Sequence, residues 1–182
     1  MKHVIVPLAP GFEEIEAVVI VDFLRRAGLR VTVAAVVGAL PVTGSHGIVV
    51  VADARIEDAD LGAADAIVLP GGVPGARNLG ASEILRAALR EAAAAGRLLG
   101  AICAAPAVLD AHGLLAGRRA TSHPNHRAEM TNCTYVEERV VTDGHVVTSR
   151  GAGTAVEFAA QLVRCLVGET AADDILRAIQ SR

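Results

Sequence analysis

Short apolar runs alternate along this chain with longer segments in which apolar residues recur at helical spacing. The apolar runs predict buried strands at 3–8, 29–37, 48–51, 66–69 and 97–102. The helical pattern predicts helices at 13–27, 82–95, 105–112, 154–167 and 171–179, and residues 140–147 predict a hairpin closed by Asp143-Gly144. This alternation predicts a doubly wound α/β fold, a mostly parallel sheet with helices on both faces.

Composition narrows the class of protein. With 182 residues and no break in composition, the chain is expected to form one domain, 1–182, with a sizeable core. No apolar run approaches the roughly 20 residues that span a bilayer, and no signal peptide precedes the first strand, so no membrane contact is expected. A net charge of −3 and few aromatic residues argue against nucleic acid as a partner. Three scattered cysteines predict a reducing, cytoplasmic setting.

Cys103 is the most informative residue, because it lies between an apolar strand and a helix start. A thiol at a helix N-terminus meets the positive end of the helix dipole and unpaired N–H groups, which favour the nucleophilic thiolate. Pro106 suits the first turn of a helix and supports this placement. The alternative is a small, buried and inert cysteine. Cys165, by contrast, lies in an apolar helical stripe and is expected in the core.

Three glutamates crowd the start of the first predicted helix. Glu13 and Glu14 are explained by complementing the helix dipole. Glu16 is followed at helical spacing by Val19 and Ile20, which places it on the face expected to be buried. A buried carboxyl has a raised pKa, so Glu16 becomes a candidate to hydrogen-bond a thiolate or to shuttle a proton.

Further candidates follow other strand ends. Gly71-Gly72 suits either a turn with positive φ or close backbone approach to a ligand, with amides that stabilise an oxyanion. Gly151 lies in a glycine-rich helix start that suits anion binding or capping, and capping is favoured. His123 is the best histidine partner for Cys103, although His126 competes with it and a plain loop histidine is the alternative. No Cys or His pair has the spacing of a zinc site, so no metal is expected.

Six blocks together resemble the ThiJ/PfpI superfamily, most closely its DJ-one branch: GFEEIE at 11–16, DFLRRAG at 22–28, LPGG at 69–72, AICAAP at 101–106, SHP at 122–124 and TSRG at 148–151. The resemblance implies a flavodoxin-like fold of the class I glutamine amidotransferase type, usually a homodimer. It also implies Cys103 as nucleophile, Glu16 as its carboxyl partner and His123 nearby. Backbone amides of Gly72 and Ala104 would form the oxyanion pocket beside Gly71, and Arg26 would contact an anion.

The family includes cofactor-independent glyoxalases and deglycases for α-oxoaldehydes and their adducts, as well as oxidative-stress sensors and chaperones. Two departures matter here. Ala104 stands where the protease-like branch has a histidine, so the catalytic base that peptidase activity needs is missing at this position. His46 stands where DJ-one proteins often carry an anion-binding arginine, which leaves Arg26 without its usual companion.

The leading hypothesis is an enzyme whose Cys103 thiolate adds to the aldehyde of methylglyoxal or glyoxal, a small carbonyl substrate, without a metal or nucleotide cofactor. Glu16 or His123 would move protons between adjacent carbons, and water would release a hydroxy acid. The alternative is a redox sensor or stress-responsive chaperone in which Cys103 becomes a sulfinate beside Glu16. A binding module with an inert thiol is the third possibility.

Overall fold

A single seven-stranded sheet forms the centre of the molecule in a computed structural model that describes residues 1–181. Its strand order is β10-β11-β7-β6-β1-β2-β5, and every pairing is parallel except that of β10 with β11. The strands are β1 (His3–Leu8), β2 (Arg30–Ala35), β5 (Ala54–Arg55), β6 (Ala66–Leu69), β7 (Leu98–Ile102), β10 (Val140–Asp143) and β11 (Val146–Ser149).

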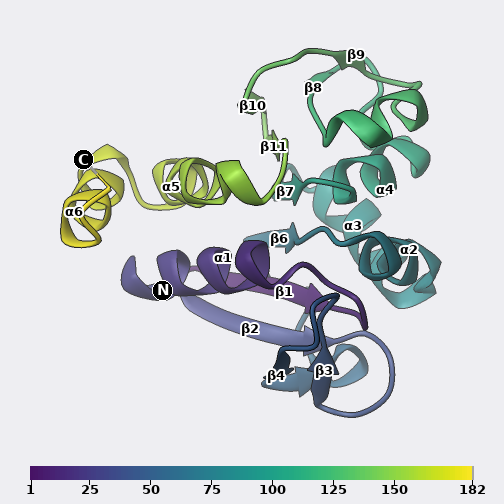
Figure 1. The fold of residues 1–182 in the computed structure, drawn as a ribbon, viewed down its shortest axis with the longest axis horizontal. Helices are drawn as coiled ribbons and strands as arrows, with labels where there is room; N and C mark the ends of the chain where they lie inside the picture. Colours follow the sequence, from purple (N-terminus) through teal and green to yellow (C-terminus); the bar gives the residue numbers. More distant parts are fainter. Residues whose placement is uncertain (182) are drawn as a thin grey trace.

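Helices cover both faces of this sheet, because alternate residues of a strand point to opposite sides. On β1, Val4 and Val6 face one core and Ile5 faces the other. The first core is completed by α1 (Glu14–Arg26), α5 (Ala155–Leu166) and α6 (Glu169–Ala178), and the second by α2 (Val73–Ala81), α3 (Glu83–Ala94) and α4 (Ala105–Ala111) (Figure 1). The predicted doubly wound, flavodoxin-like α/β fold is confirmed.

Some local predictions need correction. The predicted strand at 48–51 exists as β4 (Val49–Val51), but it pairs with β3 (Pro41–Thr43) in a separate antiparallel hairpin, not with the central sheet. Helix α2 was not predicted, because its Pro74, Gly75 and Gly80 have low helix propensity. A two-stranded pair, β8 (Arg119–Ala120) with β9 (Thr134–Tyr135), was also missed, as were three short 3-10 helices, η1 (Ile56–Asp58), η2 (Pro124–Glu129) and η3 (Ala152–Thr154).

The winding of the chain reverses next to β1. From β1 the chain passes to β2 on one side, whereas β6 and β7 follow on the other. In open α/β sheets, ligands bind beyond the carboxyl ends of the strands at such a reversal. The arrowheads of β1, β6 and β7 point the same way in Figure 1, so the segments that follow these strands lie at one edge of the sheet.

None of the helices within residues 1–181 combines the length and the hydropathy needed to cross a lipid bilayer.

Candidate active site

Cys103 adopts a backbone conformation that non-glycine residues rarely adopt, with φ of 66°. It lies between the end of β7 and the start of α4, as predicted. Its N–H donates to the Ser149 carbonyl at 3.0 Å, and its own carbonyl accepts from the His123 N–H at 2.9 Å. Bonds on both sides therefore hold the strained conformation that aims the thiol into the site, an arrangement that clusters at functional sites.

Glu16, in the first turn of α1, is fully buried beside this thiol. Its Oε2 accepts the Gly71 N–H at 2.8 Å, while its Oε1 is buried without a hydrogen-bond partner among residues 1–181. Burial raises the pKa of Glu16 to about 7, against the opposing effects of the Gly71 N–H and the Cys103 thiol. A carboxyl with this pKa can hold or release a proton near neutral pH.

The thiol itself is harder to ionise than its position in the sequence suggested. Burial, followed by the negative charge of Glu16, raises the pKa of Cys103 to about 12, although hydrogen bonds from the backbone N–H groups of Gly72 and Ala104 lower it. The helix start therefore does not create a thiolate alone. Two acidic groups share one desolvated space, and the sulfur is ionised most readily when Glu16 carries the proton.

Glycines at the end of β6 allow these groups to come together. A Cβ at Gly71 would lie 2.6 Å from Cys103 Cβ and 2.7 Å from Glu16 Oε2, far inside van der Waals contact. Gly72 has φ of 93°, and a Cβ there would lie 2.3 Å from the Gly11 carbonyl oxygen. The glycine pair thus serves both the turn and a close backbone approach to the thiol.

His123 and Gly151 close the site from the other side. The position that a Cβ on Gly151 would take is 3.4 Å from His123 Cδ2, 3.9 Å from Cys103 Sγ and 4.0 Å from Glu16 Oε1. His123 Nδ1 accepts the Asn125 N–H at 3.3 Å, which leaves Nε2 as the ring nitrogen free for a ligand. The competing His126 is held by Glu129 at 2.8 Å.

For Gly151 capping was favoured over anion binding, and its contact with the thiol was missed. The available signal was its place directly beyond the predicted hairpin, since β11 pairs in parallel with β7 and brings Ser149 opposite Ile102. Cys165 is exposed, so the expectation that it lies in the core is wrong. It is next to, but not on, the buried stripe of α5 that contains Val163 and Leu166.

Arg26 does not join the site. It occupies the last turn of α1, ten residues beyond Glu16, and ten residues of helix span roughly 15 Å. Its Nε bonds Asp22 at 2.6 Å on an exposed surface. Within this chain Arg26 therefore lies far from Glu16, and its role as an anion contact stays a prediction.

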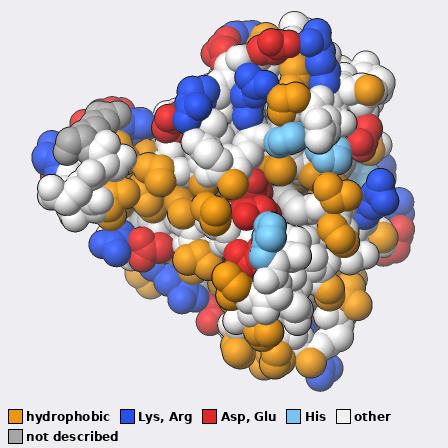
Figure 2. Space-filling model, viewed as in Figure 1, with side chains coloured by type: hydrophobic (Ala, Val, Ile, Leu, Met, Phe, Trp, Pro, Cys, Tyr) orange, Lys and Arg blue, Asp and Glu red, His pale blue; other side chains and the backbone are white. Residues whose placement is uncertain are grey.

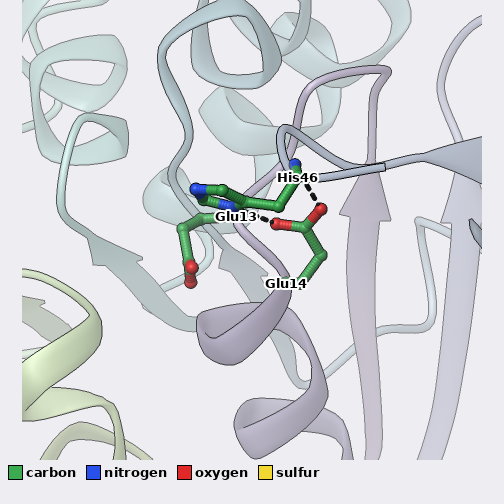
Figure 3. Close-up of side chains that lie close together, drawn as sticks. All are labelled: Glu13, Glu14 and His46. Atoms are coloured by element: carbon green, nitrogen blue, oxygen red, sulfur yellow. Dashed lines mark hydrogen bonds and ion pairs between the residues drawn. The ribbon is translucent and has the colours of Figure 1, made fainter. Parts of the chain in front are cut away.

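A second polar cluster lies at the start of α1, where Glu13, Glu14 and His46 place ligand-type atoms within 4.8 Å of one another (Figure 3). Glu14 accepts the His46 N–H at 2.6 Å through Oε1 and His46 Nδ1 at 2.8 Å through Oε2. These bonds outweigh the effect of burial and lower the pKa of Glu14 to about 2. Because both Glu14 oxygens are engaged, the cluster tethers the β3–β4 hairpin to α1, and only Glu13 and His46 Nε2 retain capacity for a cation.

Comparisons with known proteins point to the same family that the sequence motifs resemble. The model of the DJ-1/PfpI family matches residues 2–165. Protein DJ-1 homolog B of Arabidopsis thaliana is 43% identical over 91% of this chain, which spans only 38% of that protein. The glutathione-independent glyoxalase DJR-1.2 of Caenorhabditis elegans is 37% identical over 97% of this chain and 95% of its own length. The structure of oxidized Toxoplasma gondii DJ-1 superposes with a TM-score of 0.96 at 40% identity, covering 99% of this chain and 98% of the other.

Proposed function

Because the chain belongs to the DJ-1/PfpI family, we propose that it is a cofactor-independent glyoxalase that converts small α-oxoaldehydes such as methylglyoxal to hydroxy acids. The family contains a protein named as a glutathione-independent glyoxalase. In this proposal Cys103 is the nucleophile, and one domain supplies the whole site from the ends of β1, β6, β7 and β11. Aldehyde adducts of amines, which are the substrates of deglycases, would be attacked by Cys103 in the same way.

One observation carries the proposal: Cys103 Sγ, the unpartnered Glu16 Oε1 and the His123 ring all lie within 4.0 Å of one point beside Gly151. A nucleophile, a proton carrier and a further acid or base thus surround a space for a small substrate. The backbone N–H groups of Gly72 and Ala104, which lower the pKa of the Cys103 thiol, are placed to stabilise an oxyanion formed next to the sulfur.

The reaction then follows from these positions. Glu16 accepts the thiol proton as sulfur adds to the aldehyde carbon and then passes this proton to the carbonyl oxygen, which gives a neutral hemithioacetal and leaves Glu16 ionised. A base, Glu16 or His123, removes the hydrogen on that carbon as a proton, and a proton is returned to the neighbouring carbonyl carbon. The electron pair of the broken C–H bond moves with this shift, and the hydroxyl proton of the hemithioacetal passes to the ketone oxygen. The aldehyde carbon thereby becomes a thioester and the ketone becomes an alcohol. Water hydrolyses the thioester, releasing the hydroxy acid and the thiol.

Ala104 argues against a peptidase. It follows the nucleophile directly and is buried, so no base occupies the position that the protease-like branch uses. The redox-sensor alternative uses the same residues, since a sulfinic acid on Cys103 would lie beside the free Glu16 Oε1.

The test is lactate formation from methylglyoxal by the purified protein in the absence of glutathione. We expect turnover by the wild type, loss of at least a hundredfold in kcat/KM for Cys103→Ala, and no change for the matched control Cys133→Ala. Equal turnover by Cys103→Ala would refute the proposal. If the wild type turns over no α-oxoaldehyde but mild peroxide oxidises Cys103 ahead of Cys133 and Cys165, sensing replaces catalysis as the function.

A further inference from the structure

A cavity of about 410 Å³ opens beside the nucleophile, on the side of β10 and β11. His123 and Gly151 line it, and these two residues also border the Cys103 thiol. The cavity therefore adjoins the Cys103 thiol through His123 and Gly151. Its charged lining is one-sided: Arg139 and Arg150 contribute to it, and no Asp or Glu among residues 1–181 does so.

The two arginines differ in their availability. Arg139 is engaged, since its guanidinium bonds Glu157 at 2.7 and 2.9 Å and the Gly153 carbonyl at 2.9 Å. Arg150, half-buried directly after β11, makes no side-chain hydrogen bond or ion pair with any other described residue. A guanidinium presents several N–H donors in one plane and binds carboxylate or phosphate oxygens in pairs. Arg150 is thus free to bind an anion in this cavity.

The opposite side of the site carries the opposite charge. Glu13, Glu14 and Glu16 all lie at the start of α1, after β1, whereas Arg150 follows β11 on the far side of β6 and β7. In Figure 2 acidic and histidine side chains gather near the middle of the visible face, and basic side chains lie on the side of β10 and β11. An anionic group would be repelled from the start of α1 and attracted toward Arg150. This arrangement of charge would orient an anionic substrate before it reacts.

We propose that Arg150 binds the anionic end of the substrate, and that the preferred substrates are α-oxoaldehydes carrying a carboxylate or phosphate a few bonds from the aldehyde. The inference rests on the proposed glyoxalase function and specifies its substrate class. The reaction needs no further reagent: R–CO–CHO and water give R–CHOH–COOH, with the aldehyde carbon oxidised and the ketone carbon reduced within one molecule.

The test compares 4,5-dioxopentanoate, which carries a carboxylate, with 2-oxopentanal, its neutral counterpart of equal chain length. The measured quantity is the ratio of their kcat/KM values. We expect the wild type to favour the anion by up to about fivefold, which is the most that a partly exposed ion pair contributes in affinity. Arg150→Gln should remove this preference and Arg150→Lys should retain part of it. Arg55→Gln, an exposed arginine on the opposite sheet edge, should leave it unchanged.

Inorganic phosphate separates the two anion types. If it inhibits wild-type turnover of 4,5-dioxopentanoate competitively and Arg150→Gln weakens that inhibition, the subsite accepts phosphate as well as carboxylate. Turnover of both aldehydes with equal kcat/KM, or a preference that survives in Arg150→Gln, would overturn the inference while leaving the glyoxalase proposal intact.

A second measurement does not depend on turnover. Iodoacetate and iodoacetamide alkylate the same sulfur but differ in charge, so the ratio of their rates at the Cys103 peptide, followed by mass spectrometry, reports the local field. Arg150→Gln should lower the iodoacetate-to-iodoacetamide ratio about fivefold, and Arg55→Gln should not change it. An unchanged ratio in Arg150→Gln would count against the anion subsite even if the protein proved not to be a glyoxalase.

Discussion

Replacing Glu16 by Gln should make the protein more stable at alkaline pH. Glu16 is fully buried, and burial raises its pKa to about 7 from its ordinary value of 4.5. Glutamine has the shape of the protonated acid and can still accept the Gly71 N–H bond that Glu16 Oε2 accepts at 2.8 Å. The substitution therefore removes a buried negative charge while keeping the hydrogen bond.

The direction and size of this change in stability follow from proton linkage. Between pH 4.5 and about 7 the folded protein holds a proton on this group that the unfolded chain has lost, so the free energy of unfolding falls as pH rises through that window. At one pKa unit per 1.36 kcal/mol, the shift corresponds to about 3 kcal/mol above pH 7. For a chain of this length that is a change in Tm of roughly 10 °C. The value belongs to the Glu16–Cys103 pair, whichever atom finally carries the charge.

Urea unfolding of the wild type and Glu16→Gln at intervals from pH 4 to 8.5 measures this difference. The two proteins should have nearly equal stability at pH 4, and the variant should gain on the wild type up to about pH 8. Glu57→Gln, an exposed carboxylate without a partner among the described residues, should follow the wild type at every pH. If the difference in the free energy of unfolding between the wild type and Glu16→Gln stayed constant with pH, the buried charge would be refuted as the cause of that difference.

Two further predictions follow from local geometry. Gly151→Ala should fold normally but lower kcat/KM for methylglyoxal about tenfold. The added Cβ would lie in ordinary contact with Cys103 Sγ, at 3.9 Å, and would occupy the space proposed for the substrate. Unchanged kinetics would contradict the placement of the substrate there. We also propose that the exposed apolar side chains of α1 and the β3–β4 hairpin, among them Val18 and Val51, bind a second copy of the chain (Figure 2). Light scattering should then show a dimer that Val51→Glu converts to monomer, whereas the control Val167→Glu, at a valine that is also exposed, stays dimeric. A monomeric wild type would refute the dimer.

The placement of Cys103 and Glu16 could be predicted because each depends on local signals. An apolar strand followed by a proline-marked helix start places the thiol, and two apolar neighbours at helical spacing bury the carboxyl. Gly151 could not be placed in the same way, because its approach to the thiol depends on the register of β11 against β7. Arg150 could not be distinguished from other arginines until the partners of Arg139 were known.

The ionisation of Cys103 shows why position in the sequence is not sufficient for reactivity. A helix start stabilises a thiolate by aligned N–H groups, but this effect is limited to fractions of a kcal/mol up to about 2 kcal/mol. Burial and a neighbouring carboxylate act in the opposite direction and raise the pKa to about 12. Reactivity therefore depends on Glu16 taking up the thiol proton, and Glu16 can hold that proton near neutral pH because burial raises its pKa to about 7. The same desolvation that destabilises the folded chain above pH 7 thus supplies the proton carrier that the thiol requires.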